Sequence, residues 1–561
     1  MTVVATTGPA TGFHLARTPE MLALTFLISA PWRAGCLSRI TSDRQICVNE
    51  PPALLTWALP LTCFPAWTFA FVEIASRYPR GCESFIKIPA KMAHGNSPVP
   101  PGRSRRGTRY SLRSCGGFGR SHTFGSVALG SVRASLINAR AYGANPVAFY
   151  RELSGSGDGY RAVAPFDLFG RNVLISDPDL VAEVLASPSG QRFGKTGLRF
   201  FTVIRRMLGS GLFGLDGDQH QRRRRVLYPV LQGEALRPAA DAMSRAAERL
   251  CQEWAVPPSR TVDVAEAAAR TSLELLAEAL VGPPLATTAA QLGHLFAHAE
   301  PMLLRMLKAP VVFPDWLPTP GNRRLGHATA ALRNRAADLL RLDEPAPDTV
   351  LGRLLARESD PTRILDELVT LVVAGHQSTA AAITFTLYLL AKHPSEARRI
   401  AEEATATLNG RAATIDDLPA LPRTAMVVAE SMRLFPPVWI ITRRTIGTQC
   451  LGGHTLRPRT TVHICPHTLH RNPKHWPEPD RFRPERFDGT SHRHRFAYAP
   501  FGGGPHKCVG NDFALMATAI VIATVLPAIH LHPPTQDVLV SARSFTVPDG
   551  GLLLRLGPAP G

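Results

Sequence analysis

The residue types best suited to chemistry surround Cys508, in the run Pro-Phe-Gly-Gly-Gly-Pro-His-Lys-Cys-Val-Gly-Asn-Asp-Phe-Ala at residues 500–514. Three successive glycines before the cysteine allow a tight loop that turns several backbone N–H groups toward one sulfur, which stabilises a thiolate. A helix expected from Phe513 onward adds the positive end of its dipole. None of the nine cysteines lies in a CxxC pair, so a zinc site is not indicated. A lone thiolate with open space beside Gly510 suits the axial ligand of a haem iron.

Two groups of charged residues are spaced at helical intervals. Glu430 and Arg433 are three apart, so they share one face of a helix. His220 and Arg224 are four apart, in a run with four consecutive arginines, and point the same way. Two donors on one face suit a carboxylate. From spacing alone, a surface ion pair for the first group and a nucleic-acid contact for the arginines stay open.

A third candidate lies in residues 368–391, which carry no formal charge. The polar residues near the centre of this run would be costly in lipid, so we predict a core helix with a working surface at the polar break. Ser378 can donate and accept a hydrogen bond. Gln377 can orient water but cannot take up and release a proton.

These segments together resemble the cytochrome P450 family. Residues 501–510 resemble the cysteine-ligand loop of that family, residues 430–433 its E-x-x-R helix, residues 482–487 its P-E-R-F segment, and residues 374–379 its A-G-x-[DE]-T-[TS] motif. The resemblance covers about residues 141–556. It implies the cytochrome P450 fold, a single large domain that is mainly α with small β-sheets, over residues 141–558.

The resemblance also assigns roles to individual positions. It makes Cys508 the axial iron ligand of haem b (iron protoporphyrin IX). The expected cofactor contacts are His220, Arg224, Arg443, His506, Phe501, Gly502, Gly510, Ala374 and Gly375. The expected structural ion network is Glu430, Arg433 and Arg486. The expected substrate pocket is lined by Val438, Trp439, Ile440, Phe200 and Phe201. Docking charges for an acidic redox partner are expected at Arg222, Arg223 and Arg225.

The activity implied by this resemblance is monooxygenation. The enzyme would use O2 and two electrons from a separate partner, either ferredoxin with its reductase or a flavoprotein reductase, to hydroxylate or epoxidise a hydrophobic small molecule. Ser378, Gln377 and Thr379 are the candidates for proton delivery. Because Gln377 replaces the usual acid, three outcomes stay open: a water relay past Gln377, a peroxygenase, or a haem-thiolate isomerase. A non-catalytic haem sensor is a further alternative. If proton delivery is limiting, Gln377→Glu should improve the coupling of reductant to product.

The elements that would position these residues are mostly helical. Apolar periodicity predicts helices at residues 241–254, 263–281, 289–307, 328–342, 363–392, 395–408 and 423–434. Short strands are predicted at 172–175 and 460–464, and from residue 538 onward.

Residues 1–140 differ from the rest of the chain. They carry 16 Lys and Arg against 5 Asp and Glu, so much of the net charge of +19 lies there. We expect an extension outside the folded domain, disordered or non-native, with no nucleic-acid role. The uncharged run 51–72 is long enough for a bilayer, but Pro60 and Pro65 interrupt it. Membrane association through that run stays open, whereas the composition, rich in Ala, Arg and Gly and poor in Lys, favours a cytoplasmic bacterial enzyme.

Overall fold

The computed structural model describes seven short backbone strands between Thr2 and Ile74, and then residues 138, 140–154, 159–163, 171–255, 259–308, 312–341, 345–490 and 493–558. The chain divides into two compact units, Met1–Ser114 and Cys115–Gly561. The second unit contains all of the sequence motifs described above.

The strands of the first unit form two small sheets. Their order is β2-β1-β3-β4-β7 in one sheet and β5-β6 in the other. The bounds are β1 Thr2–Val4, β2 His14–Ala16, β3 Leu22–Thr25, β4 Thr56–Leu59, β5 Leu61–Thr62, β6 Phe69–Ala70 and β7 Glu73–Ile74. The run 51–72 therefore contains strands β4 to β6 instead of the spanning helix considered above, and Pro60 separates β4 from β5. The expectation of disorder for the rest of residues 1–137 falls outside the described residues.

The second unit is mainly helical, as predicted. Its helices are α2 Pro146–Ser154, α3 Pro178–Leu185, α4 Arg199–Leu208, α5 Gly217–Leu227, α6 Arg237–Ala255, α7 Val264–Val281, α8 Pro283–Lys308, α9 Pro320–Arg341, α10 Val350–Leu355, α11 Pro361–Lys392, α12 Pro394–Leu408, α13 Pro422–Leu434, α14 Pro466–Leu469 and α15 Asn511–Val525.

The strands of this unit form small sheets at the edge of the helical part. The largest has the order β10-β12-β15-β9-β8, with β15 parallel to β9 and the other pairs antiparallel. Its strands are β8 Tyr160–Val163, β9 Asn172–Ile175, β10 Phe193–Gly194, β12 Ile441–Thr445 and β15 Thr461–Ile464. The smaller sheets contain β11 Arg260–Asp263, β13 Gln449–Leu451, β14 His454–Leu456, β16 Ile529–Leu531, β17 Val540–Ala542, β18 Thr546–Pro548 and β19 Leu553–Pro558.

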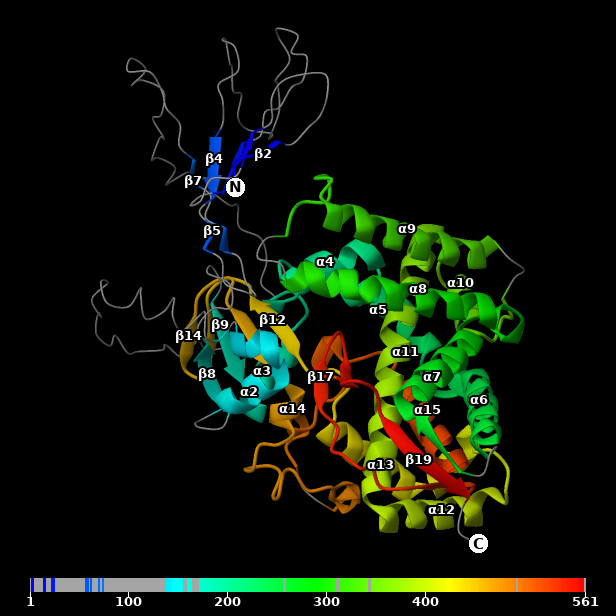
Figure 1. Cartoon of the computed structure of the whole chain (residues 1–561). Helices are drawn as coiled ribbons and strands as arrows, with labels where there is room; N and C mark the ends of the chain where they lie inside the picture. The colour runs from blue at the N-terminus through cyan, green and yellow to red at the C-terminus, as the bar shows by residue number, and fades with distance from the viewer. Residues whose placement is uncertain are drawn as a thin grey trace, which may run out of the picture. The chain divides into compact units, whose positions relative to one another are not determined.

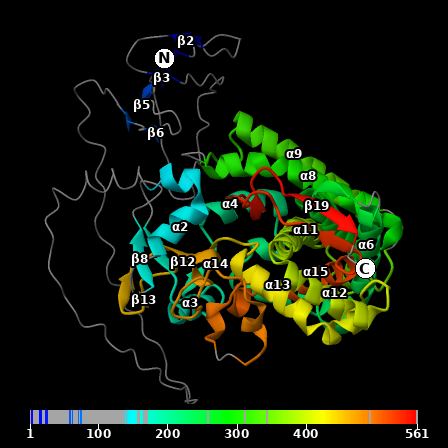
Figure 2. The same ribbon diagram turned by 60° about the horizontal axis from the view of Figure 1, so that its bottom comes forward.

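Helix α11 lies at the centre of the helical part and contacts α7, α15, α13, α8, α9 and α4 (Figures 1 and 2). It begins after Asp360, whose side chain accepts hydrogen bonds from the backbone N–H groups of Thr362 and Arg363, and Pro361 is its first residue. Among the described helices it alone is long and apolar enough to cross a membrane, but 72% of its apolar window is buried inside the protein. It is therefore a core helix, as the polar centre of its sequence predicts.

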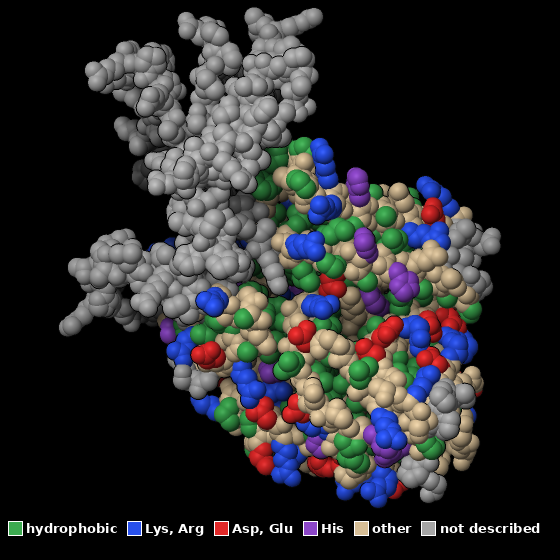
Figure 3. All heavy atoms as spheres, in the orientation of Figure 1, with side chains coloured by type: hydrophobic (Ala, Val, Ile, Leu, Met, Phe, Trp, Pro, Cys, Tyr) green, Lys and Arg blue, Asp and Glu red, His purple; other side chains and the backbone are tan. Residues whose placement is uncertain are grey.

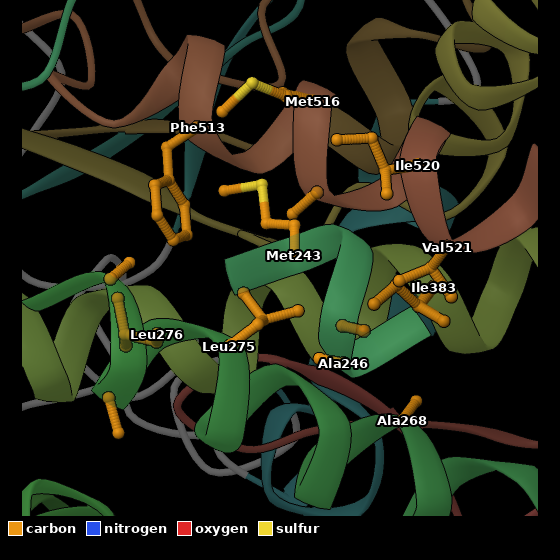
Figure 4. Packing of buried hydrophobic residues seen from close by; sticks show 14 of the residues in the cluster. Met243, Ala246, Ala268, Leu275, Leu276, Ile383, Phe513, Met516, Ile520 and Val521 are labelled. Carbon is orange, nitrogen blue, oxygen red and sulfur yellow. The ribbon is translucent and has the colours of Figure 1, made fainter. Parts of the chain in front are cut away.

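The core around α11 is built from apolar faces of four helices. Met243 and Ala246 of α6, Leu275 and Leu276 of α7, Ile383 of α11, and Phe513, Met516 and Ile520 of α15 converge there (Figure 4). Helix α15 is apolar on all sides because it is enclosed by α6, α11 and α13. This core holds two elements in place: α11, which carries residues 374–379, and the start of α15, which directly follows the Cys508 loop.

The surface of the second unit is mixed in charge. On the face seen in Figure 3, basic and acidic side chains are interspersed over the described residues. Outside residues 1–140 the chain carries 47 Lys and Arg against 39 Asp and Glu. This distribution is that of an ordinary protein surface rather than a single basic face.

Candidate active site

The Cys508 loop is held in a tight conformation that only glycine permits. The backbone N–H of Cys508 donates to the carbonyl of Phe501 at 3.0 Å, which closes the loop. Gly504 has φ +62°, and a Cβ on it would lie 1.9 Å from the carbonyl oxygen of Leu185 on α3. Phe501 packs against the apolar cluster that includes Ala382, so the loop lies beside α11.

Cys508 combines an exposed residue surface with a desolvated thiol. The residue is exposed, yet burial raises the pKa of its thiol. A hydrogen bond from the backbone of Gly510 and the charges of Arg224 and Lys507 oppose that rise. Exposure of the residue and desolvation of its thiol are compatible if the sulfur borders a space inside the protein. Ala374, in the middle of core helix α11, is likewise exposed.

Four basic side chains are buried together near this loop. The side chains of Lys195, His220, Arg443 and His506 are each less than one-tenth exposed. Burial lowers the pKa of Lys195 to about 7 and that of Arg443 to about 10. Burial, and then the neighbouring positive groups, lower the pKa of His220 to about 3. Burial likewise lowers the pKa of His506 to about 4.

Asp216 is the carboxylate that faces this basic cluster. Its Oδ1 lies 3.2 Å from His506 Nε2, and it accepts hydrogen bonds from the backbone of Lys195 and from Ser189. Together with these contacts, the histidine holds the pKa of Asp216 below its usual value, although burial acts in the opposite direction. Among the described residues, Asp216 is the carboxylate beside the two cationic side chains Lys195 and Arg443, and the Nδ1 atoms of His220 and His506 are buried without a hydrogen-bond partner. The donor set therefore fits an anionic ligand, such as a haem propionate.

The run of four arginines on α5 splits into different environments. Arg224 Nη1 donates to the carbonyl of Lys507 at 2.6 Å, which ties α5 to the Cys508 loop. Arg222 and Arg225 are exposed, and their role as docking charges stays a prediction. The expectation for Arg223 is wrong, because this side chain is 7% exposed and is bound to Glu358 at 2.7 Å and Glu367 at 3.0 Å.

Two members of the Glu-Arg-Arg group, Glu430 and Arg433, lie on the buried face of α13. Glu430 and Arg433 are both fully buried, and their side chains form two bonds at 2.6 and 2.8 Å. Arg486 Nε lies 3.3 Å from Glu430 Oε1. Arg433 also donates to the carbonyls of His470 and Pro479, so its guanidinium ties α13 to the segment after α14.

The residues of the motif at 374–379 on α11 have different surroundings. Ser378 Oγ donates to the carbonyl of Ala374 at 2.8 Å, and Thr379 is buried. Gly375 lies where α7 comes close, because a Cβ on it would be 2.9 Å from Leu276 Cδ2. The glycine at this position therefore permits close helix packing. Gln377 Nε2 donates to Glu300 Oε2 of α8 at 3.2 Å.

The predicted pocket residues divide between two places. Phe200 and Phe201 on α4 form an aromatic cluster with Phe213, with ring centroids 5.3 to 6.1 Å apart. Trp439 belongs to a separate core, where its ring lies near Tyr142 and Tyr150 and its Nε1 donates to the carbonyl of Arg543. Its neighbours Val438 and Ile440 are half-buried. Gly502 lies in the Cys508 loop, where the nearest atom to an added Cβ is 3.9 Å away.

Lys195, Asp216 and Glu300 are absent from the sequence-based site. The cluster around Lys195 and Asp216 joins segments that are far apart in the chain, so no spacing rule brings them together. Asp216 has a local signal: its side chain caps α5, directly before the run that contains His220. Glu300 has none, because its partner Gln377 lies 77 residues away.

Comparisons with known proteins agree on one family. The sequence model named Cytochrome P450 matches residues 166–555. The cyclooctat-9-en-7-ol 5-monooxygenase of Streptomyces melanosporofaciens is 32% identical over 65% of this chain and 81% of its own length. The cyclooctatin synthase of the same organism is 31% identical over 72% and 91%, respectively. The pentalenene oxygenase of Streptomyces avermitilis is 29% identical over 68% and 86%.

Solved structures share the fold. The crystal structure of the cytochrome P450DA heme domain superimposes with a TM-score of 0.67 at 24% identity, covering 74% of this chain and 93% of that one. That of CYP175A1 from Thermus thermophillus gives a TM-score of 0.56 at 28% identity, covering 69% and 89%.

Proposed function

This chain belongs to the cytochrome P450 family of haem-dependent monooxygenases, and we propose that it oxidises a cyclic terpenoid beside a haem b whose iron is bound by Cys508. The observation that carries the proposal is the Cys508 thiol, which is accessible and yet desolvated at the end of a glycine loop. A coordinating cation deprotonates such a thiol outright. Haem with a thiolate ligand supplies oxygen activation, because the thiolate pushes electron density that favours O–O cleavage.

The protein's own groups would hold the cofactor at its two charged ends. We propose that Lys195, His220, Arg443 and His506 bind the haem propionates, with Asp216 holding His506 in place. A propionate pair would accept a hydrogen bond from the orphaned Nδ1 of His220 and would neutralise the charges of Lys195 and Arg443. Arg224, through its bond to the Lys507 carbonyl, orients the Cys508 loop.

Further cofactor contacts follow from position. Phe501, Gly502 and Gly510 flank Cys508 in the same loop, and we propose that they contact the cysteine side of the ring. Ala374, an exposed residue in the middle of α11, would face the opposite side of the ring. Gly375 would act indirectly, by letting α7 hold α11 in place. The buried Glu430, Arg433 and Arg486 network would stabilise the fold below the site.

The substrate class is supported by both the relatives and the apolar lining. The bacterial relatives are named for cyclooctat-9-en-7-ol, cyclooctatin and pentalenene. Phe200, Val438 and Ile440 are half-buried apolar side chains and Phe201 is buried, and we propose that these four line the substrate pocket. We leave Trp439 out of the pocket because its ring is packed with Tyr142 and Tyr150. Pockets lined in this way select for shape and apolarity.

Electrons would come from a separate protein. Members of the family draw on redox partners, and we propose a ferredoxin with its reductase, docked at the exposed Arg222 and Arg225 of α5 on the cysteine side. We place the enzyme in the cytoplasm and assign the catalytic fold to residues 141–558. Residues 1–140 are, on this proposal, an extension that haem binding does not need.

The carbon monoxide difference spectrum tests the proposal. The wild type, reduced and exposed to carbon monoxide, should show the blue-shifted band of thiolate-ligated iron. Cys508→Ser should lose that band, whereas Cys251→Ser, at a half-buried free cysteine on α6, should keep it. A panel of cyclic terpene hydrocarbons and alcohols should then shift the ferric spectrum. Persistence of the band in Cys508→Ser, or a panel that leaves the spectrum unmoved while fatty acids shift it, would refute the ligand or the substrate class.

A further inference from the structure

Glu300 is an unusual carboxylate for its surroundings. It lies on α8, directly before Pro301 inside that helix, and is 8% exposed. Within the described part of the chain no Arg, Lys or His lies at ion-pair distance from it. Its two oxygens are used instead by neutral donors: Oε1 accepts from the backbone N–H of Ser544 at 3.3 Å and Oε2 accepts from Gln377 at 3.2 Å. A buried carboxylate without a cation is costly, so a fold does not gain stability by keeping one.

The charge of Glu300 acts on residues 374–379 of α11, which lie on the oxygen side of the haem under the proposed function and are called the oxygen-side motif from here on. Burial lowers the pKa of His376, the neighbour of Gln377, and the Glu300 charge opposes that change. The other titratable group that acts on His376 there is His294 of α8, which lowers its pKa. The carboxylate therefore belongs electrostatically to the motif on α11, although it comes from another helix.

We propose that Glu300 is the carboxylate of the oxygen-side site, supplied from α8 and acting through Gln377 as a positioning residue. This inference rests on the proposed function. A carboxylate can only accept hydrogen bonds, so Glu300 fixes the Gln377 amide with Nε2 toward α8. The amide oxygen is then the free end, a fixed acceptor one residue from Ser378. That acceptor orients the water through which protons reach the site, and Gln377 itself neither gains nor loses a proton.

The pair also explains why an amide stands at position 377. An acid there would place two carboxylates at hydrogen-bond distance, where like charges prevent both from ionising. The two positions are therefore complementary: one carboxylate and one amide are needed, and the chain has the carboxylate at 300. The sequence-based expectation that Gln377→Glu improves coupling is replaced by the opposite one, because Glu300 is already there.

A swap of the two groups tests the contact without the cofactor. We compare haem-free wild type, Glu300→Gln, Gln377→Glu and the double variant carrying both changes, by thermal unfolding from pH 5 to 8. In Gln377→Glu, the neighbouring Glu300 raises the pKa of the introduced carboxyl in the folded state. The free energy of unfolding of this variant therefore falls as pH rises through that raised pKa. We expect a Tm that falls with pH in Gln377→Glu only, and a wild-type profile in the double variant. Equal profiles in Gln377→Glu and the double variant would overturn the contact.

The same four proteins test the function once loaded with haem. The measurement is hydrogen peroxide released per reductant oxidised, with the terpenoid from the spectral panel that binds most tightly. In Glu300→Gln the amide at 300 can donate as well as accept, so the Gln377 amide can flip and exchange its oxygen and nitrogen. We therefore expect roughly fivefold more peroxide. Gln377→Glu should release a similar excess of peroxide, and that excess should depend on pH. Peroxide release by the double variant should be within about twofold of the wild-type value.

A matched control separates positioning from loss of a buried acid. Glu278 on α7 is also 8% exposed but pairs with Arg245 and Arg249. Glu278→Gln should lower stability and leave peroxide release unchanged. Wild-type release in Glu300→Gln, or equal leaks in Gln377→Glu and the double variant, would refute the role of Glu300. A wild type without the thiolate carbon monoxide band would instead refute the proposed function, and this inference with it.

Discussion

Replacing Lys195 with methionine should make the haem-free protein more stable at neutral pH and the haem-bound protein less able to keep its cofactor. Lys195 is 6% exposed, lies beside Arg443, and has Asp216 as its nearby acid. Its Nζ donates to the carbonyl of Phe213 at 2.8 Å. A propionate would supply the missing anion, so the lysine is costly before haem binds and favourable afterwards.

The size of the effect follows from the pKa of this lysine. Burial and the Arg443 charge lower the pKa of Lys195 from 10.5 to about 7 in the folded haem-free protein. Because the pKa of Lys195 is lower in the folded protein than in the unfolded one, the free energy of unfolding is highest above pH 10.5. It falls as the pH drops from 10.5 toward about 7. Each unit between the working pH and 10.5 corresponds to about 1.4 kcal/mol, which at pH 8 gives about 3 kcal/mol. Subtracting the lost bond to Phe213, of about 1 kcal/mol, leaves Lys195→Met about 2 kcal/mol more stable at pH 8.

Urea unfolding of the haem-free proteins at pH 8 and pH 10 checks this prediction. The advantage of Lys195→Met should be present at pH 8 and should shrink at pH 10. After reconstitution, transfer of haem to apomyoglobin should be about tenfold faster from Lys195→Met, as expected for one lost charge-assisted bond. Lys392→Met is the control, because a bond to Asp537 raises the pKa of that lysine, so its loss should not stabilise the protein. An advantage for Lys195→Met that is absent at pH 8 would refute the reasoning.

Two further substitutions test the parts of the fold that hold the site. Glu430→Gln should destabilise by about 3–5 kcal/mol, because Arg433 is left as a buried uncompensated charge; urea midpoints of the haem-free proteins measure this, and a loss below 1 kcal/mol, about the value of an exposed pair, would contradict it. Gly504→Ala should cost about 2 kcal/mol or more and lower haem content, since the added Cβ meets the Leu185 carbonyl at φ +62°. Gly410→Ala, at φ +84° with no atom within 4 Å of the added Cβ, is its matched control and should be milder.

Long buried helices were predictable from the sequence because the pattern that marks them is local. The uncharged runs of α11 and α15 and the short apolar run of β9 each lie within one element, and the predicted bounds of β9 agree with the structure. Helix starts were less predictable. Helices α8 and α9 begin at Pro283 and Pro320 rather than near 289 and 328. Proline is favoured in a first turn, but its ring also looks like a break to a periodicity argument.

Partners distant in the chain were the main thing the sequence could not supply. The four arginines on α5 are indistinguishable as letters, yet Arg223 is buried because Glu358 and Glu367 meet it from the start of α11 and the turn before it. The basic cluster has the same character. His220 and His506 could be placed by motif, whereas Lys195 and Asp216 join them only through the folded arrangement of β10, α5 and the Cys508 loop.

The oxygen-side motif shows how such a distant partner can reverse the meaning of a substitution. Judged from the motif alone, Gln377 removes a proton-exchanging group, because an amide stands where the family has an acid. With α8 in place, the same amide supplies the hydrogen bond that Glu300 needs beside α11, since Gln377 donates to a carboxylate that has no cation within ion-pair distance in the described structure. A sequence that carried acids at both positions would satisfy the motif and still bury two like charges in contact. Proton delivery on this proposal therefore depends on Gln377 of α11 and Glu300 of α8 together, and the motif on α11 alone does not describe it.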